Sequence, residues 1–299
     1  MKLQGIFPAI ATPFDHKGDL YKIKVQHNVE KWNRTELSGY VVCGSTGESV
    51  FLSADEKLQL FEWVAQYAAP GKLLIAGTGA ESVRESVRMT NRCAELGYKA
   101  ALVLTPHYYR AMMARATMGR QDAQLLFFRA VADQTKIPVL LYNFPQVCGL
   151  ELTPETVAAL SEHPNIAGMK DSSGNLEGTK KFLAAAKPGF QVMTGSANVL
   201  AASLAAGCSG AVLAFANAAP YSCISIWEAH RTRETEAAED WQNRIAKAAT
   251  LIASTYGIPG LKHAMDLNGY YGGIPRLPFV PVGPEAQAEI AAAFHGLKG

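Results

Sequence analysis

The chain has 299 residues, 48% of them hydrophobic and 18% charged, and a formal net charge of +2, with no lysine- or arginine-rich run. This length fits one large domain or two ordinary ones, and the small charge argues against a nucleic-acid partner, which would require a basic surface. No apolar stretch reaches the ~20 residues of a membrane-spanning helix and the first residues lack a signal-peptide layout, so we expect a cytoplasmic protein without a membrane partner.

Short apolar segments recur along the chain between helix-forming stretches. Most are apolar on both faces and bounded by Gly, Pro, Thr or Asn, which is typical of strands in a buried parallel sheet. The eight segments that predict strands are residues 6–10, 39–43, 73–77, 100–104, 137–142, 166–170, 190–194 and 210–213.

The stretches between these segments carry signals for helix starts. Ser53, with Glu56 three residues later, forms a capping-box pattern that predicts a helix reaching to about residue 67. A later helix is predicted to begin after Thr153, because Pro154 suits the first helical position and the acid that follows it complements the helix dipole.

Eight strands separated by helices predict an α/β fold of the closed (β/α)8 TIM-barrel type. A doubly wound open sheet would more often have five or six strands and a GxGxxG turn, and neither feature is present. The residues after the eighth strand are largely helix-forming. We therefore expect a barrel catalytic domain over residues 1–222 and C-terminal helices over residues 223–299 that pack on the barrel.

Barrel enzymes carry their chemistry at the carboxyl ends of the strands. In this chain those ends carry hydroxyl groups, phenols, small residues and one amine, which we expect to meet at one mouth of the barrel. The residues concerned include Gly44, Ser45, Thr46, Tyr108, Tyr142, Lys170, Gly195 and Ser196.

The cysteines and histidines do not form a metal-binding or disulfide pattern. The five cysteines are scattered, odd in number and without a CxxC pair, which argues against a disulfide framework and a zinc site. The seven histidines include no HxxxH pair at helical spacing. We therefore expect a reduced protein without a metal.

Lys170 is the residue that most strongly suggests a particular chemistry. An ordinary lysine has a pKa near ~10.4 and is protonated at neutral pH, whereas burial in an apolar site favours the neutral amine that attacks a ketone. The resulting protonated imine of a 2-oxo acid is an electron sink for cleaving or forming carbon–carbon bonds. The alternative interpretation is a lysine that extends from the strand end into water.

Side chains at neighbouring strand ends fit this chemistry. The phenol of Tyr142 can transfer protons, with Ser45 or Thr46 as a relay, and the backbone N–H groups of the turn at residues 44–47 can hold a carboxylate. Each group also has an ordinary interpretation. The turn can simply join a strand to a helix, Tyr142 can be a rim aromatic, and Tyr108 can be a lid or an oligomer contact.

Three motifs, in this order, resemble a known family: GSTGE at residues 44–48, YNFP at 142–145 and GMKDS at 168–172. They are similar to those of the dihydrodipicolinate synthase / N-acetylneuraminate lyase superfamily of pyruvate-dependent class I aldolases, and the similarity covers essentially the whole chain. The resemblance implies that Lys170 forms the Schiff base without a cofactor, that Tyr142 transfers protons, and that Ser45 and Thr46 contact the pyruvate carboxylate and complete the relay.

The resemblance also implies an assembly and further binding positions. Members of this family are usually homotetramers, dimers of dimers, in which the phenol matching Tyr108 enters a neighbouring subunit's site. Gly195 and the backbone of Val212 match positions that line the pyruvyl pocket. The predicted substrate-binding residues are thus Gly44, Ser45, Thr46, Ser172, Gly195, Ser196 and Val212.

Substrate choice within the family depends on a few positions. Dihydrodipicolinate synthases carry an arginine where this chain has Val147, and a valine cannot form the bidentate pair with a carboxylate. Sialic acid lyases carry acidic residues where Ser196 and Ala197 stand. Several segments, such as TPHYYR at residues 105–110, resemble the 4-hydroxy-2-oxoglutarate aldolase branch, in which Arg110 is the candidate cation for a second carboxylate.

These observations predict an aldolase that cleaves a 4-hydroxy-2-oxo acid, similar to 4-hydroxy-2-oxoglutarate, to pyruvate and an aldehyde such as glyoxylate. The alternative enzymes are an aldolase or dehydratase of a 2-oxo sugar acid and a dihydrodipicolinate synthase, which Val147 disfavours. A further alternative is a non-catalytic relative that binds a 2-oxo acid. The intact set of Lys170, Tyr142, Ser45 and Thr46 argues against that one.

Overall fold

Eight parallel strands form a closed barrel in the computed structural model, which describes residues 2–113, 120–297 and 299. Strands that are consecutive in sequence are neighbours from β2 to β8, and β8 pairs with β1. The barrel closes where Ala9 bridges to Val41 and the N–H of Ile10 donates to the carbonyl of Val41 at 2.9 Å. The predicted (β/α)8 barrel is therefore confirmed.

The strands lie close to their predicted positions. β1 ends two residues earlier than predicted, while β5 begins two residues later and extends to Asn143 because that residue pairs with Asp171. The strands are β1 (Gly5–Pro8), β2 (Gly39–Val42), β3 (Leu73–Gly77), β4 (Ala100–Leu104), β5 (Val139–Asn143), β6 (Ile166–Asp171), β7 (Gln191–Thr194) and β8 (Gly210–Leu213).

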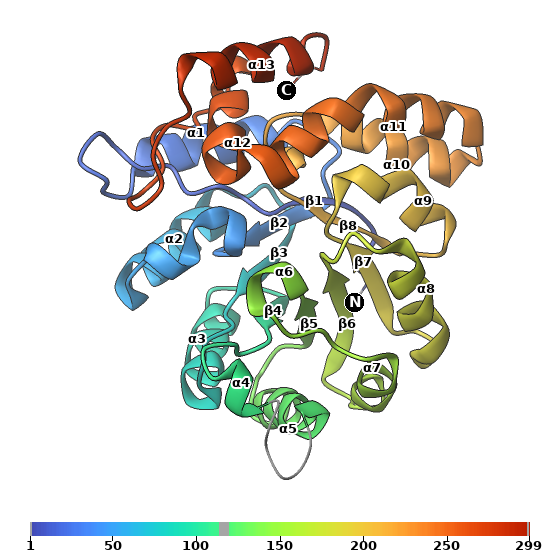
Figure 1. Cartoon of the computed structure of the whole chain (residues 1–299). Coiled ribbons are helices and arrows are strands. Elements are labelled where there is room, and N and C mark those ends of the chain that lie inside the picture. Colours follow the sequence, from blue (N-terminus) through green and yellow to red (C-terminus); the bar gives the residue numbers. More distant parts are fainter. Residues whose placement is uncertain (1, 114–119, 298) are drawn as a thin grey trace.

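Helices surround the strands (Figure 1). The predicted capping box is present, with the Ser53 hydroxyl accepting from the Glu56 N–H at 3.2 Å and the Glu56 carboxylate accepting from the Ser53 N–H at 2.8 Å. The helices of the barrel are α1 (Lys22–Asn33), α2 (Ala54–Tyr67), α3 (Val83–Glu95), α4 (Arg110–Met113), α5 (Arg120–Ala132), α6 (Pro145–Cys148), α7 (Pro154–Ser161), α8 (Leu176–Ala185) and α9 (Leu200–Ala205).

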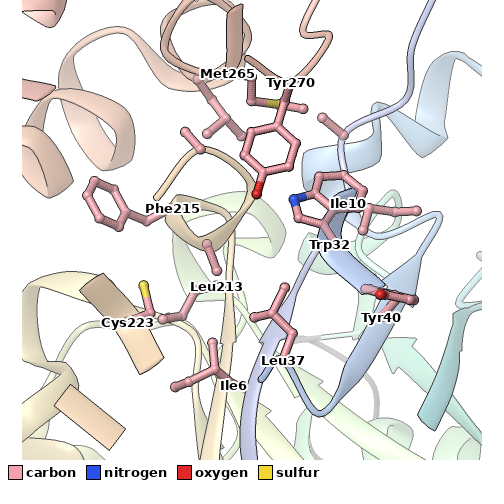
Figure 2. Packing of buried hydrophobic residues seen from close by; sticks show 14 of the residues in the cluster. Ile6, Ile10, Trp32, Leu37, Tyr40, Leu213, Phe215, Cys223, Met265 and Tyr270 are labelled. Carbon is pink, nitrogen blue, oxygen red and sulfur yellow. The ribbon is translucent and has the colours of Figure 1, made fainter. Parts of the chain in front are cut away.

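The C-terminal part of the chain is helical and joins the core of the barrel. Tyr270 stacks on Trp32 of α1 with ring centroids 5.4 Å apart, and Figure 2 shows Met265 and Tyr270 close to Trp32 and Phe215. The elements are α10 (Pro220–Thr232), α11 (Thr235–Thr250), a π-helical turn (Leu251–Thr255), α12 (Gly257–Leu267) and α13 (Pro284–Phe294). The boundary expected between residues 222 and 223 lies inside α10.

Apolar side chains fill both the inside of the barrel and the layer between the strands and the helices. Phe7, Val41, Ile75, Leu140 and Met193 form part of the interior cluster. Because side chains fill the interior of such a barrel, we expect its ligand site at the ends of the strands. Among the described residues, no helix is long and apolar enough to span a membrane.

Candidate active site

Lys170 and Tyr142 lie side by side at the carboxyl ends of β6 and β5, where they are register partners. The Lys170 amine donates to the Tyr142 hydroxyl at 3.2 Å and lies 4.4 Å from the centroid of that ring. The residues are only 5% and 4% exposed, respectively. Lys170 is therefore held inside the barrel mouth and does not extend into water, and its nearest polar contact is a group that can exchange protons.

A cavity of about 480 Å³ opens in front of this pair. It is bounded by the turns after β2, β5, β6, β7 and β8 and by the segment from the end of α11 to α12. The predicted site residues that line it are Ser45, Thr46, Tyr142, Lys170, Ser172, Gly195 and Ser196. The structure thus brings together seven residues that are separated by up to about half of the chain.

Three predicted residues do not line the cavity. Gly44 precedes the short 3-10 turn that carries Ser45 and Thr46, and Val212, whose backbone was predicted to line the pocket, has its side chain buried inside the barrel. Tyr108 is 75% exposed and packs edge-to-face on Tyr109. The exposed position of Tyr108 leaves it available to a neighbouring molecule.

The turn after β2 offers fewer free amides than its glycine content suggests. The N–H groups of Gly47 and Glu48 donate to the carbonyls of Gly44 and Ser45, at 3.0 and 3.1 Å. Within the part of the chain that the structure describes, the N–H groups of Ser45 and Thr46 have no backbone acceptor. A bound carboxylate therefore finds two amides and two hydroxyl groups at this turn.

A buried carboxylate behind Lys170 was not predicted as part of the site. Asp171 is 2% exposed, and its carboxylate accepts hydrogen bonds from Asn143 at 2.9 Å and from Thr179 at 2.6 Å. Asn143 in turn accepts from the Leu152 N–H at 3.0 Å. These bonds fix the ends of β5 and β6 relative to each other, so they position the Lys170–Tyr142 pair.

The outer wall of the cavity was also missed. Ile252, Ala253 and Ser254 of the π-helical turn line it together with Ile258 and Leu261 of α12. π-Helical turns occur frequently at functional sites because they change the direction of consecutive side chains. No local sequence signal near residue 250 indicates this contact, since it depends on how the C-terminal helices pack over the barrel.

Gly195 leaves the space that the Lys170 side chain occupies. A Cβ atom at this position would lie 2.8 Å from Cε of Lys170 and 2.0 Å from Oγ of Ser172. We expect Gly195→Ala to fold, because both contacted groups are side-chain atoms, but to displace the Lys170 amine and lower kcat/KM by about 10²-fold, as small misplacements of reacting groups do. Steady-state kinetics with a Gly283→Ala control, where no atom lies within 4 Å of the new Cβ and the backbone is not left-handed, measure the effect. Wild-type kinetics for Gly195→Ala would contradict it.

Neither thiol nor metal chemistry is indicated by the described residues. All five cysteines are buried, and burial raises the pKa of the Cys43, Cys148 and Cys208 thiols to about 12. Such thiols remain protonated and are poor nucleophiles. No group of three or more His, Cys, Asp or Glu side chains among the described residues is arranged to hold a metal ion.

The fold and the cavity define a class of protein: a (β/α)8-barrel enzyme with a buried lysine–tyrosine pair at the carboxyl ends of its strands. The chain belongs to the dihydrodipicolinate synthetase family, whose model matches residues 2–296. Members of this family are pyruvate-dependent carbon–carbon lyases, and the chain is therefore a lyase of this type. The family that the three motifs predicted is confirmed.

Individual relatives differ in the reaction that their names state. A 4-hydroxy-tetrahydrodipicolinate synthase of Exiguobacterium sp. is 33% identical over 292 residues, which cover 97% of each chain. A probable mitochondrial 4-hydroxy-2-oxoglutarate aldolase of Emericella nidulans is 33% identical over 296 residues, covering 97% of this chain and 93% of that one. The solved dihydrodipicolinate synthase of Acinetobacter baumannii in complex with pyruvate has a TM-score of 0.92 at 27% identity and covers 99% of each chain.

Proposed function

We propose that the chain is a Schiff-base aldolase that cleaves a 4-hydroxy-2-oxo acid to pyruvate and an aldehyde. The observation that carries this proposal is the 3.2 Å contact between the buried Lys170 amine and the Tyr142 hydroxyl. An amine in this position can add to a ketone, and the adjacent phenol can move the proton that bond cleavage releases. No cofactor is needed, because the imine itself accepts the electrons.

The proposed reaction has four balanced steps. The Lys170 amine adds to C2 of the substrate, one proton is taken up from solvent and water leaves, which gives a protonated imine. Tyr142 takes the proton of the C4 hydroxyl and passes its own proton through the relay of Ser45 and Thr46 to water. The C3–C4 bond breaks, the aldehyde departs, and the electron pair forms an enamine with the imine carbon. Protonation of C3 and addition of water then release pyruvate and the free amine.

The side chains in the distal part of the cavity bear on whether the substrate carries a second carboxylate or hydroxyl groups. The lining of the cavity includes the uncharged polar side chains of Gln146, Ser196, Asn198 and Ser254, and the described lining residues include no Asp, Glu, Arg or His. Arg110, the cation expected for a second carboxylate, does not line the cavity. This uncharged wall favours a second candidate function, the aldol cleavage of a 2-oxo sugar acid whose released aldehyde carries hydroxyl groups.

Product analysis distinguishes these functions. The protein is incubated separately with 4-hydroxy-2-oxoglutarate and with a 3-deoxy-2-oxo sugar acid, and free pyruvate and the aldehyde are measured. Release of pyruvate and aldehyde in equal amounts supports aldol cleavage. The substrate with the higher kcat/KM shows which group the distal part of the cavity binds. Loss of water without pyruvate supports a dehydratase. Binding without any turnover supports the non-catalytic alternative.

Val147 allows a direct test of how the distal end is recognised. This residue lines the cavity and is 46% exposed. It stands at the position where dihydrodipicolinate synthases carry an arginine. We expect Val147→Arg to raise the kcat/KM ratio of 4-hydroxy-2-oxoglutarate to the sugar acid by about 10- to 100-fold, since it adds a charged hydrogen-bond donor for a carboxylate. Val147→Met is the control of similar length without charge. An unchanged ratio of the kcat/KM values would mean that the distal carboxylate of the substrate does not bind near residue 147.

We further propose that the chain assembles as a homotetramer in which Tyr108 enters a neighbouring subunit's cavity. The exposed side chains of Tyr108, Tyr109 and Met112 support a contact of this kind, because a cluster of large exposed apolar groups is typical of an interface. A sedimentation experiment measures the assembly. A monomer with full activity would contradict the role of Tyr108.

A further inference from the structure

Glu48 and Lys262 form an ion pair in the interior of the protein. Glu48 ends the turn that carries Ser45 and Thr46, whereas Lys262 belongs to α12, more than 200 residues later. The carboxylate and the amine are 2.8 Å apart, and the two side chains are 0% and 1% exposed. The pair therefore joins the hydroxyl-bearing turn of the cavity to the C-terminal helices without contact with solvent.

Both charges have additional hydrogen-bond partners. The Lys262 amine donates to the carbonyls of Thr12 at 2.8 Å and Ile274 at 2.9 Å, and the Glu48 carboxylate accepts from the Arg276 N–H at 2.8 Å. Burial lowers the pKa of Lys262, and the Glu48 carboxylate opposes this effect. Segments from both ends of the chain thus converge on one buried pair.

Stability alone does not account for such a pair. Removing two charges from water is costly, and well-packed apolar residues in place of a buried ion pair are often as stable or more stable. Glu48 also adopts a left-handed conformation with φ of 55°, which is disfavoured for a residue with a Cβ atom. Strain of this kind persists where surrounding contacts hold it and is concentrated at functional sites.

The location of Lys262 connects this pair to the cavity. Leu261, the preceding residue, and Ile258 line the cavity wall, while Ser45 and Thr46 line it from the turn that Glu48 ends. The pair thus fixes the α12 wall relative to the turn. A second anchor of the same turn is the Thr12 hydroxyl, which donates to the carbonyl of Gly47 at 2.6 Å.

We propose that Glu48 and Lys262 are positioning residues that hold the amides and hydroxyls of Ser45 and Thr46 where the carboxylate of a 2-oxo acid bound to Lys170 must lie. This inference rests on the proposed Schiff-base function. It predicts that breaking the pair weakens the binding of pyruvate before imine formation, while the Lys170 amine, which is held from β6, keeps its ability to form the adduct when pyruvate is saturating.

Borohydride trapping of the pyruvate imine tests this prediction on the intact protein. We expect Glu48→Gln to raise the pyruvate concentration for half-maximal trapping by about 10-fold or more, the size of effect of a lost hydrogen bond to a charged group. The final yield of adduct at saturating pyruvate should match the wild type. The double variant Glu48→Gln/Lys262→Met removes both charges, so it should regain thermal stability relative to the single variant but not pyruvate affinity.

Glu85→Gln is the control. Glu85 forms an ion pair with Arg88 on α3 at 2.7 Å, and neither residue lines the cavity, so this change should leave the affinity for pyruvate unchanged. If Glu48→Gln does not fold, Thr12→Val tests the same turn through its second anchor, with a smaller shift in the same direction. If the folded Glu48 or Thr12 variants need the same pyruvate concentration for half-maximal trapping as the wild type, the positioning role alone is overturned. Absence of any adduct in the wild-type protein would overturn the proposed function as well.

Discussion

Replacing Lys170 with methionine is expected to abolish aldol cleavage. Methionine keeps an unbranched apolar side chain in the space between Tyr142 and Gly195, so the barrel mouth should remain folded, but no amine is left to form the imine. Loss of a covalent nucleophile lowers kcat by about 10⁶-fold in enzymes where the nucleophile acts with its proton-transfer partner. The measurement is the rate of pyruvate release, together with the thermal unfolding temperature as a check of folding.

Trapping with borohydride gives the same prediction a second readout. Wild-type protein reduced in the presence of pyruvate should gain one reduced pyruvyl group, on the peptide that contains Lys170, and Lys170→Met should gain none. Lys180→Met is the control, because Lys180 is an exposed residue that pairs with Glu177 outside the cavity. Turnover by Lys170→Met, or activity that EDTA removes from the wild type, would instead support a metal-dependent aldolase.

Much of this site could be predicted because its residues end consecutive strands. Strands buried on both faces produce short apolar runs, and the residue after each run lies at the same end of a parallel barrel. This rule alone places Tyr142 beside Lys170, since β5 and β6 are adjacent, and it places Ser45 and Ser196 across the same mouth. The capping box at Ser53 and Glu56 was predictable for a similar reason, because its signal lies within four residues of sequence.

The parts that escaped prediction depend on contacts between distant segments. The wall formed by Ser254 and Ile258 depends on the packing of the C-terminal helices on the barrel, which includes the stacking of Tyr270 on Trp32, and no pattern within residues 250–260 encodes that packing. The role of Asn143 escaped prediction because it depends on Asp171 of the neighbouring strand, whose carboxylate accepts from the Asn143 amide.

For Val212 the resemblance predicted a backbone contact with the pyruvyl pocket, which the position of its side chain does not test. Its side chain belongs to the interior cluster of the barrel, as expected for a residue one position before the end of β8. Alternation along a strand sends successive side chains to opposite faces, so a one-residue difference in where a strand ends decides whether a side chain lies in the barrel or toward the helices.

Tyr142→Phe is expected to separate imine formation from turnover. The phenylalanine ring can keep the stacking on Phe144, whose centroid lies 5.6 Å from that of Tyr142, and it can keep the contact with the Lys170 amine, so the cavity should retain its shape. Only the hydroxyl that accepts from Lys170 at 3.2 Å is lost. We expect the borohydride adduct to form to completion, while kcat falls by about 10²–10⁴-fold, the contribution of one acid–base group.

Single-turnover experiments decide what the lost hydroxyl does. If Tyr142 moves the protons of bond cleavage, the imine of the 4-hydroxy-2-oxo acid should form at nearly its normal rate and accumulate, and the slow step should be release of the aldehyde. Tyr98→Phe is the matched control, because Tyr98 is equally buried and donates to the carbonyl of Phe61, far from the cavity lining. Equal slowing of imine formation and of cleavage would mean that Tyr142 only orients Lys170, since a group that merely holds the amine affects every step in which the amine takes part.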